Sequence, residues 1–181
     1  MMTFHDVLGF WFRPDSRPNW FKGNAAFDAD IGRLLLPLHE EAAANRLPEW
    51  RDHPQGCLAL VILLDQVPRN VFRDSVRAFA TDPTARALTR LAIDRGYDDG
   101  LDDDQRCFLY LPLEHSEDIA DQRLSVELFR FRVRDPVYQD YAERHLKVIE
   151  RFGRFPHRNR ILGRVSTEEE LDFLKRPGSS F

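Results

Sequence analysis

The chain has 181 residues, a length typical of one compact domain, and 43% of them are hydrophobic, including 14 phenylalanines. This composition excludes a disordered chain and predicts helices packed around large aromatic side chains. The formal net charge of −4 argues against general nucleic-acid binding, which requires a basic surface. We therefore expect one α-helical domain over residues 1–181, with a frayed tail at residues 176–181 and no nucleic-acid partner.

The cysteines and the longest apolar run predict a cytoplasmic protein. Cys57 and Cys107 lie far apart in apolar stretches, as expected for buried thiols in a reducing compartment. The N-terminal residues lack the basic region and the cleavage site of a secretory signal. The longest apolar run, residues 57–64, is much shorter than the ~20 residues that cross a bilayer. No membrane partner is expected.

The first predicted helix begins after Thr3, a suitable N-cap. The proline-containing segment 14–18 ends it. Trp20 and Phe21, in the loop that follows, are expected to fill the core.

Two helical patterns follow. Residues 25–47 carry apolar side chains at helical spacing, and Pro37 inside the pattern predicts one kinked helix. Pro54 is a suitable first residue for the next helix, in which residues 58–64 are apolar on nearly all sides. That helix is expected at the centre of the core.

In the second half of the chain, Thr81 is the N-cap candidate of a helix that Gly96 follows. Residues 102–104 can begin a short helix that Pro112 stops. Ser116 and its acidic neighbours are expected to open a longer helix, with its inner face at the positions Ala120, Leu124, Leu128 and Phe131.

Two further helices are expected before the tail. Pro136 begins one that runs to Gly153. Overlapping capping boxes at Ser166 and Thr167 precede the last one. Because no segment alternates with the period of a strand, the predicted class is all-α.

The first of three polar segments is residues 65–73, directly after the most apolar run. In a continuous helix, Asp65, Arg69 and Arg73 would share one face, with Gln66 beside them. Pro68 should free the carbonyl of Leu64. The alternative to a ligand site is a structural network of ion pairs.

The second polar segment is residues 113–117. His115, beside Glu114 and Glu117, is a candidate general acid or base oriented by a carboxylate, and a helix N-terminus at Ser116 would favour a bound anion. The alternative interpretation makes Ser116 a cap and Glu117 its partner in the first turn.

The third polar segment, residues 151–164, has five arginines, one histidine and no acidic residue. Arg154, His157, Arg158 and Arg164 are its candidate ligand-binding or catalytic residues, since guanidinium groups match phosphate and carboxylate oxygens. Equally, these arginines could pair with the acids of the first two segments and stabilise the fold. The charge balance predicts that all three segments meet in space.

Known cofactor and catalytic motifs are missing from the sequence. There is no phosphate-binding loop, dinucleotide fingerprint or hydrolase elbow, and no histidine–acid spacing typical of a metal site. We predict neither a cofactor nor a metal.

Five stretches resemble one family over nearly the whole chain: VLGFWF, LVILLDQVPRNVFR, AFATDPTARAL, FLYLPLEHSEDIADQ and FGRFPHRNRILGRVSTEEELDFL. Together they are similar to the bacterial domain of unknown function 924 family. Gly9, Asn45 and Val67 depart from its usual residues, but no charged position does. The resemblance implies a TPR-like stack of antiparallel helix pairs and no assigned activity.

Two functions therefore remain open. The first is a pocket for a small anionic ligand, with or without catalysis, formed by ligand-binding and catalytic residues from all three segments: Asp65, Gln66, Arg69, Arg73, His115, Glu117, Arg154, His157, Arg158 and Arg164. The second is a TPR-like module that binds a peptide or protein partner, with the charged segments purely structural.

Overall fold

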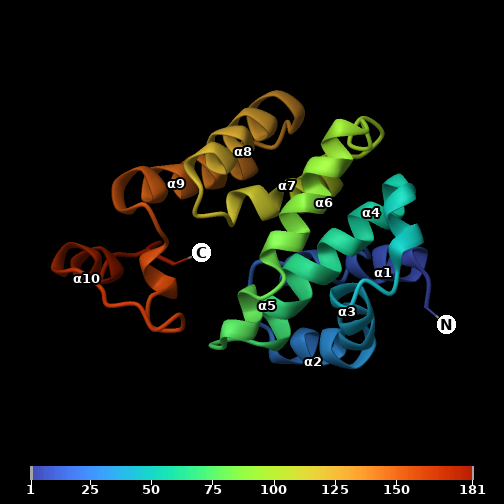
Figure 1. The fold of residues 1–181 in the computed structure, drawn as a ribbon, viewed down its shortest axis with the longest axis horizontal. Helices are drawn as coiled ribbons and strands as arrows, with labels where there is room; N and C mark the ends of the chain where they lie inside the picture. The colour runs from blue at the N-terminus through green and yellow to red at the C-terminus, as the bar shows by residue number, and fades with distance from the viewer. Residues whose placement is uncertain (1, 181) are drawn as a thin grey trace.

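The computed structural model describes residues 2–180, and helices form all of its regular secondary structure (Figure 1). Helix accounts for 68% of the chain, about twice the share in an average globular protein. No strand occurs within the described residues. The all-α prediction is confirmed.

Within the described residues, ten α-helices follow one another: α1 (Phe4–Trp11), α2 (Ala25–Leu34), α3 (Leu36–Ala43), α4 (Pro54–Val61), α5 (Val67–Val71), α6 (Asp82–Asp94), α7 (Asp103–Glu114), α8 (Ile119–Arg132), α9 (Pro136–Phe152) and α10 (Glu168–Leu174). A π-helical segment, Ile62–Gln66, joins α4 directly to α5. Short 3-10 turns lie at Arg17–Asn19, Pro48–Asp52, Val76–Phe79 and Pro156–Arg158.

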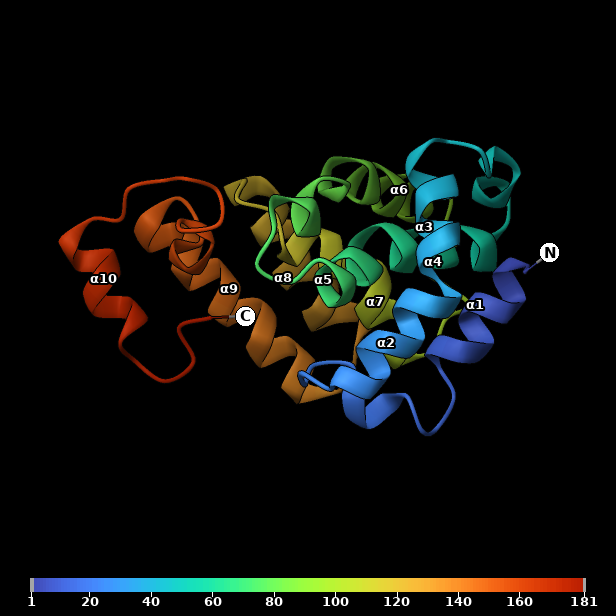
Figure 2. The same ribbon diagram turned by 90° about the horizontal axis from the view of Figure 1, so that it is seen from below.

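Helix α4 is the centre of the core, as its apolar sequence predicts. Every residue from Gly56 to Val61 is buried, and α4 contacts α1, α6 and α7. Figures 1 and 2 show it between α6 on one side and α1 with α3 on the other. Cys57 and Cys107 are both buried, as predicted, and burial raises the pKa of Cys57 to about 11.

The C-terminal part extends from this core. Helix α8 packs against α7 and α9, and α9 leads away from α4 toward α10 (Figure 2). Helix α9 ends at Gly153, as predicted. This residue has the left-handed conformation, with φ of 68°, that favours glycine at the end of a helix. The chain then returns through residues 154–167, and Phe155 packs with Val148 and Ile149 in a small second cluster.

Two predicted helix boundaries are wrong. Residues 25–47 form two helices rather than one kinked helix, because α2 ends at Leu34 and Pro37 lies in the first turn of α3. Pro112 does not stop its helix, since α7 continues to Glu114. A proline removes one donor from a helix, and the packing of α7 against α6 and α8 outweighs that loss.

The predicted inner face of α8 is only partly right, because Leu128 is buried and Leu124 packs against the core, but Ala120 and Phe131 are exposed. Phe131 is 76% exposed, whereas the polar side chains of Asp121, Gln122 and Ser125 are buried. Phe21, expected in the core, is 60% exposed, while Trp20 is buried as predicted. Gln122 Nε2 donates to the carbonyls of Glu114 and Ser116, and Asp121 accepts from the Ser116 hydroxyl, whereas the Ser125 hydroxyl has no hydrogen-bond partner among residues 2–180.

Candidate functional site

The site begins with the π-helical segment. Pro68 has no N–H to donate, and the Leu64 carbonyl instead accepts from Thr81 Oγ1 at 2.5 Å, as the sequence predicts for a freed acceptor. The Leu63 carbonyl accepts from His39 Nδ1 at 2.8 Å. Single π-helical turns inside α-helices are frequent at functional sites.

Asp65 lies in this segment and is completely buried. Its carboxylate accepts from Gln66 Nε2 at 2.6 Å and from His115 Nδ1 at 2.9 Å, and lies 3.1 Å from Arg69 Nη1. Burial alone would raise the pKa of Asp65, but Arg69 and His115 together hold it well below its ordinary value. Asp65 is therefore an ionised carboxylate inside the protein.

Arg69 joins Asp65 to the first turn of α6. Its guanidinium binds both carboxylate oxygens of Asp82, at 2.9 and 3.0 Å, and donates to the Asp65 carbonyl at 2.6 Å. Asp82 is buried. A bidentate pair of this kind fixes the position of both partners and uses up most of the donors of Arg69.

His115 is the residue after α7, and its ring contacts the first polar segment. Because the Asp65 carboxylate can only accept, the hydrogen must be on Nδ1, which leaves Nε2 without a proton in the neutral ring. Burial and the nearby Arg69 lower the pKa of His115. The sequence predicted a carboxylate partner but placed it at Glu114 or Glu117, whereas the partner is Asp65.

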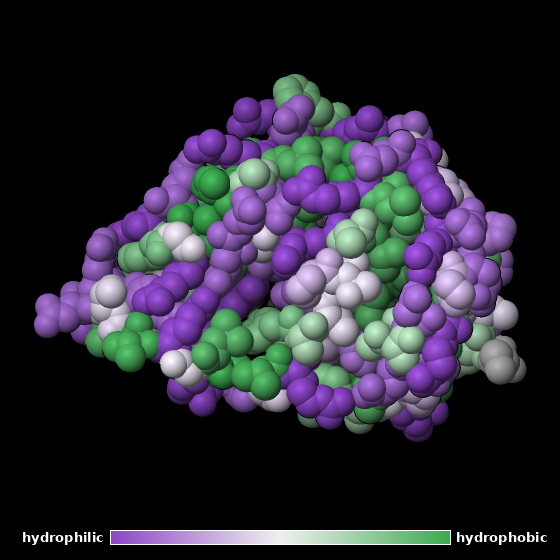
Figure 3. Space-filling model, viewed as in Figure 1, coloured by the Kyte–Doolittle hydropathy of each residue, from purple (hydrophilic) through white to green (hydrophobic). Residues whose placement is uncertain are grey.

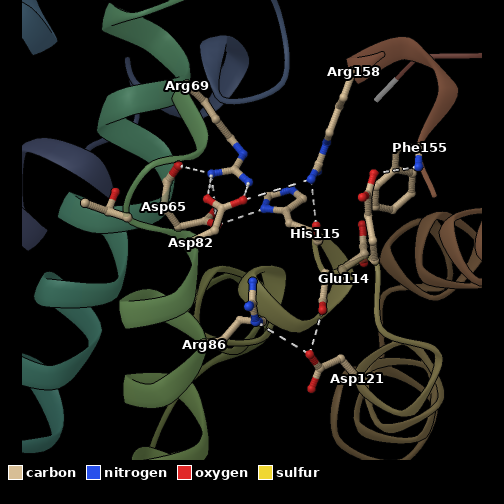
Figure 4. Close-up of polar contacts among 12 residues, drawn as sticks. Asp65, Arg69, Asp82, Arg86, Glu114, His115, Asp121, Phe155 and Arg158 are labelled. Carbon is tan, nitrogen blue, oxygen red and sulfur yellow. Dashed lines mark hydrogen bonds and ion pairs between the residues drawn. The ribbon is translucent and has the colours of Figure 1, made fainter. Parts of the chain in front are cut away.

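Arg158 reaches this cluster from the opposite side (Figure 4). It is 7% exposed, and its guanidinium lies between the rings of Phe79 and Phe155, at 4.8 and 4.5 Å from their centroids. Nη1 donates to the His115 carbonyl at 2.9 Å, and the Asp82 carboxylate is 4.0 Å away. Its Nε has no hydrogen-bond partner among residues 2–180.

Glu117 anchors the loop that carries Arg158. It accepts from the Phe155 N–H at 2.8 Å and from both Nη atoms of Arg164, at 2.6 and 2.9 Å. Burial alone would raise the pKa of Glu117, but these hydrogen bonds lower it. Arg164 therefore serves to position the loop.

A second buried group adjoins His115. Glu114 is 3% exposed, its Oε1 is 3.1 Å from His145 Nδ1, and its Oε2 has no hydrogen-bond partner among residues 2–180. Burial and the charge of Asp65 raise the pKa of Glu114 to about 8. Burial lowers the pKa of His145 to about 3. At neutral pH both are uncharged for the most part.

The three polar segments do meet, but not all of their predicted residues take part. Asp65, Gln66, Arg69, His115 and Arg158 gather in one place, with Glu117 and Arg164 beside them. His157 is half-buried next to Arg158, and burial and that neighbour lower its pKa to about 3.

Two predicted ligand-binding residues are held by carboxylates that do not belong to this cluster. Arg73 follows the end of α5 and pairs with Asp28 on α2, at 3.0 Å. It cannot share a face with Asp65, because the helix stops at Val71. Arg154 is held by both oxygens of Glu170, at 2.6 and 2.8 Å. Both guanidinium groups are therefore already paired with a carboxylate of the chain.

The helix start at Ser116 is also displaced. Helix α8 begins at Ile119, and its N-cap is Asp118, which accepts from the Ala120 N–H at 2.7 Å. Ser116 instead donates to Asp121 at 2.6 Å. A carboxylate of the chain thus occupies the position that the sequence suggested for an anion.

Sequence reasoning missed Asp82 and His145. Asp82 reads as an ordinary first-turn acid of α6, and His145 falls on the apolar face of α9. The i, i+4 spacing of Asp65 and Arg69 and the charge balance of the three polar segments pointed to the network, but neither indicated Asp82 on α6.

This face of the molecule is hollowed between the C-terminal part and the side formed by α5 and α6, and hydrophilic surface lines the hollow (Figure 3). Two cavities of about 560 and 570 Å³ lie elsewhere, one beside Arg132 and Phe131 and one beside His53 and Tyr97. We place the candidate site at Arg158 rather than in either cavity. Among the described residues, no charged side chain that lines these cavities is buried without a hydrogen-bond partner.

No helix among residues 2–180 has both the length and the apolar character needed to cross a membrane. In the same residues, no three histidine, cysteine or acidic side chains group as metal ligands.

The comparisons with known proteins agree with the helical fold. The structure of a protein of unknown function from Agrobacterium tumefaciens, ATU0120, is 42% identical, covers 95% of this chain and 96% of that one, and superposes with a TM-score of 0.89. No curated protein matches the chain. The model of the bacterial protein family of unknown function DUF924 matches residues 7–178. The chain therefore belongs to the DUF924 family.

Proposed function

We propose that the protein binds a small anion, phosphate-like or carboxylate, at Arg158. The observation that carries this proposal is the state of that guanidinium: it is 7% exposed, yet its Nε has no partner within the described residues, and its nearest carboxylate is 4.0 Å away. That carboxylate, Asp82, already forms a bidentate pair with Arg69.

Charge and burial support an anion rather than a neutral ligand. Burial and Arg69 lower the pKa of Arg158 to about 10, so it remains a cation at neutral pH. A buried cation costs several kcal/mol unless it is well paired, and Arg158 has only a long ion pair, at 4.0 Å, with a carboxylate that also neutralises Arg69. An anion on Arg158 would supply that charge, and charge-assisted hydrogen bonds contribute roughly 1.5–3 kcal/mol each.

The ligand-binding set is narrower than the sequence suggested. Arg158 would provide the principal contact, with Arg69 adding positive potential and the neutral His157 ring a hydrogen bond. Asp65 and Gln66 would orient their neighbours rather than touch an anion. The TPR-like stack, and with it a peptide-binding role, remains a prediction from the family resemblance.

A thermal-shift experiment tests the proposal. Wild-type protein is screened against inorganic phosphate, sulfate and small phosphorylated or carboxylated metabolites, with sodium chloride at matched ionic strength as the reference. At a hundredfold excess over Kd, binding adds about 2.7 kcal/mol of stability, or roughly 5–10 °C in Tm for a chain of this size.

Two variants of the third segment give the test its specificity. Arg158→Met keeps the aliphatic part between Phe79 and Phe155 but removes the charge, and it should abolish the shift. Arg160→Ala removes the same charge from a side chain that is 78% exposed, and it should keep the shift. If no anion shifts the wild type beyond chloride, or if Arg158→Met retains the shift, the proposal is wrong.

A further inference from the structure

Next to Arg158, the Asp65–His115 pair has the geometry of a base held by a carboxylate. The Asp65 oxygen and His115 Nδ1 are 2.9 Å apart, and Asp65 is fully buried while the His115 side chain is 14% exposed. Since Nδ1 carries the hydrogen, Nε2 has the lone pair. In known catalytic pairs the carboxylate fixes the tautomer in this way and stabilises the imidazolium that forms.

The ring is also next to the proposed anion. Arg158 donates to the carbonyl of His115 itself, so the two residues are in direct contact. Figure 4 shows the ring between Asp65 and Arg158. Among residues 2–180, the hydrogen bond that holds the ring is made through Nδ1. Nε2 is therefore available to a proton.

We infer that the Asp65–His115 pair is the proton acceptor of this site, and that an anion held by Arg158 binds together with a proton on His115 Nε2. This inference rests on the proposed function. The Nε2 lone pair forms the new N–H bond with a proton from solvent, and the imidazole becomes an imidazolium. Its positive charge is balanced by Asp65 on one side and by the anion on the other.

Other groups around His115 act on the same equilibrium. From the elements packed against it, the charged or titratable neighbours are Asp65 in the π-helical segment, Arg69 on α5, Asp82 on α6, Glu114 on α7, Glu117 before α8, His145 on α9, and His157 and Arg158 in the 3-10 turn.

Without a bound anion, the pKa of His115 lies below its ordinary value, mainly because of burial. Burial and Arg69 keep the ring neutral, although Asp65 favours its charged form. An added anion reverses that balance, because it offsets Arg158 and Arg69. The protein should therefore take up a proton when the anion binds. The anion should bind more tightly as the pH falls toward the pKa that His115 has without the anion. Glu114, His145 and His157 contribute little near pH 7, since Glu114 is already protonated for the most part and the two histidines titrate near pH 3.

Calorimetry with sulfate measures the proton directly. Sulfate is a dianion throughout the neutral range, so any proton taken up belongs to the protein. Binding enthalpy is measured near pH 7 in buffers with different ionisation enthalpies, and the slope gives the number of protons bound per sulfate. We expect uptake of up to about one proton in the wild type. His115→Gln should bind sulfate with this uptake lost, while His5→Gln, an exposed control on α1, should keep it.

Each result decides the question. Sulfate binding without proton uptake, or with the same uptake in His115→Gln, overturns the inference but leaves the proposed function standing. No sulfate binding that depends on Arg158 overturns the inference, and no Arg158-dependent binding of any anion in the thermal-shift screen overturns the proposed function as well. A second measurement needs no ligand: long-range ¹H–¹⁵N correlation of the wild type, with His115→Gln to assign the ring. It should show the hydrogen on Nδ1 at neutral pH, and an Nε2–H tautomer would overturn the inference.

Discussion

Because of Glu114, the free energy of unfolding should fall as the pH rises, which is the opposite of the usual effect of a carboxyl group. Burial and Asp65 raise its pKa from 4.5 to about 8, so the folded protein retains a proton that the unfolded chain loses. Between these values, the free energy of unfolding should fall by about 1.4 kcal/mol per pH unit from this group alone. Over the whole window the ceiling is roughly 5 kcal/mol, and local relaxation around the carboxylate should reduce it to about 2–4 kcal/mol.

Glu114→Gln removes this titration and little else, because glutamine has nearly the same shape. Its free energy of unfolding should be compared with that of the wild type in urea, by circular dichroism, at steps from pH 4.5 to pH 8. The difference between the two curves should favour the variant increasingly as the pH rises, while the contributions of the other groups cancel. Glu127→Gln, on the exposed side of α8, is the matched control and should follow the wild type. A flat difference curve for Glu114→Gln would refute the reasoning.

Two further substitutions test the contacts that shape the site. Thr81→Val removes the donor to the Leu64 carbonyl and leaves that acceptor unpaired, so urea denaturation should show a loss of about 1–3 kcal/mol. Glu117→Gln weakens the charge-assisted bonds to Arg164, each worth roughly 1.5–3 kcal/mol, and amide hydrogen exchange should become faster across residues 153–165.

Both predictions have matched controls in the same chain. Thr84→Val changes an exposed threonine in the first turn of α6, three residues after Thr81, and should alter the free energy of unfolding by less than about 0.5 kcal/mol. Glu169→Gln breaks an exposed pair with Arg151 and should leave the exchange of the loop unchanged. Equal effects from a variant and its control would contradict the corresponding prediction.

Much of the fold could be predicted from the sequence, because its signals are local. The N-cap at Thr3, the helix start at Pro54, the end at Gly153 and the capping box at Thr167 are all confirmed. The errors came from tertiary packing. Phe131 fits a helical apolar repeat, yet α8 turns its polar residues inward.

The site could be predicted only in part, for the same reason. The charge balance correctly implied that the three polar segments converge, but of the acids it assigned to the arginines of the third segment, Asp65, Glu114 and Glu117, only Glu117 forms a close pair with one of them, Arg164. Which acid meets which base depends on contacts between residues far apart in the sequence. Asp65 and His115 are separated by 50 positions. No spacing rule reaches that distance.

The π-helical segment constrains how many residues the chain can have between α4 and α5. It links α4 to α5 without a loop, so residues from Pro54 to Val71 form one continuous helical segment. The π-helical turn changes the direction in which the side chains before and after it point. Before the π-helical turn, α4 directs apolar side chains into the core; after it, α5 directs Arg69 toward α6. Deleting one residue from Ile62–Gln66 would remove the π-helical turn and change how α5 is placed relative to α4. The number of residues here is therefore as constrained as their identity, and an insertion or deletion would separate the site from the core without changing a single charged side chain.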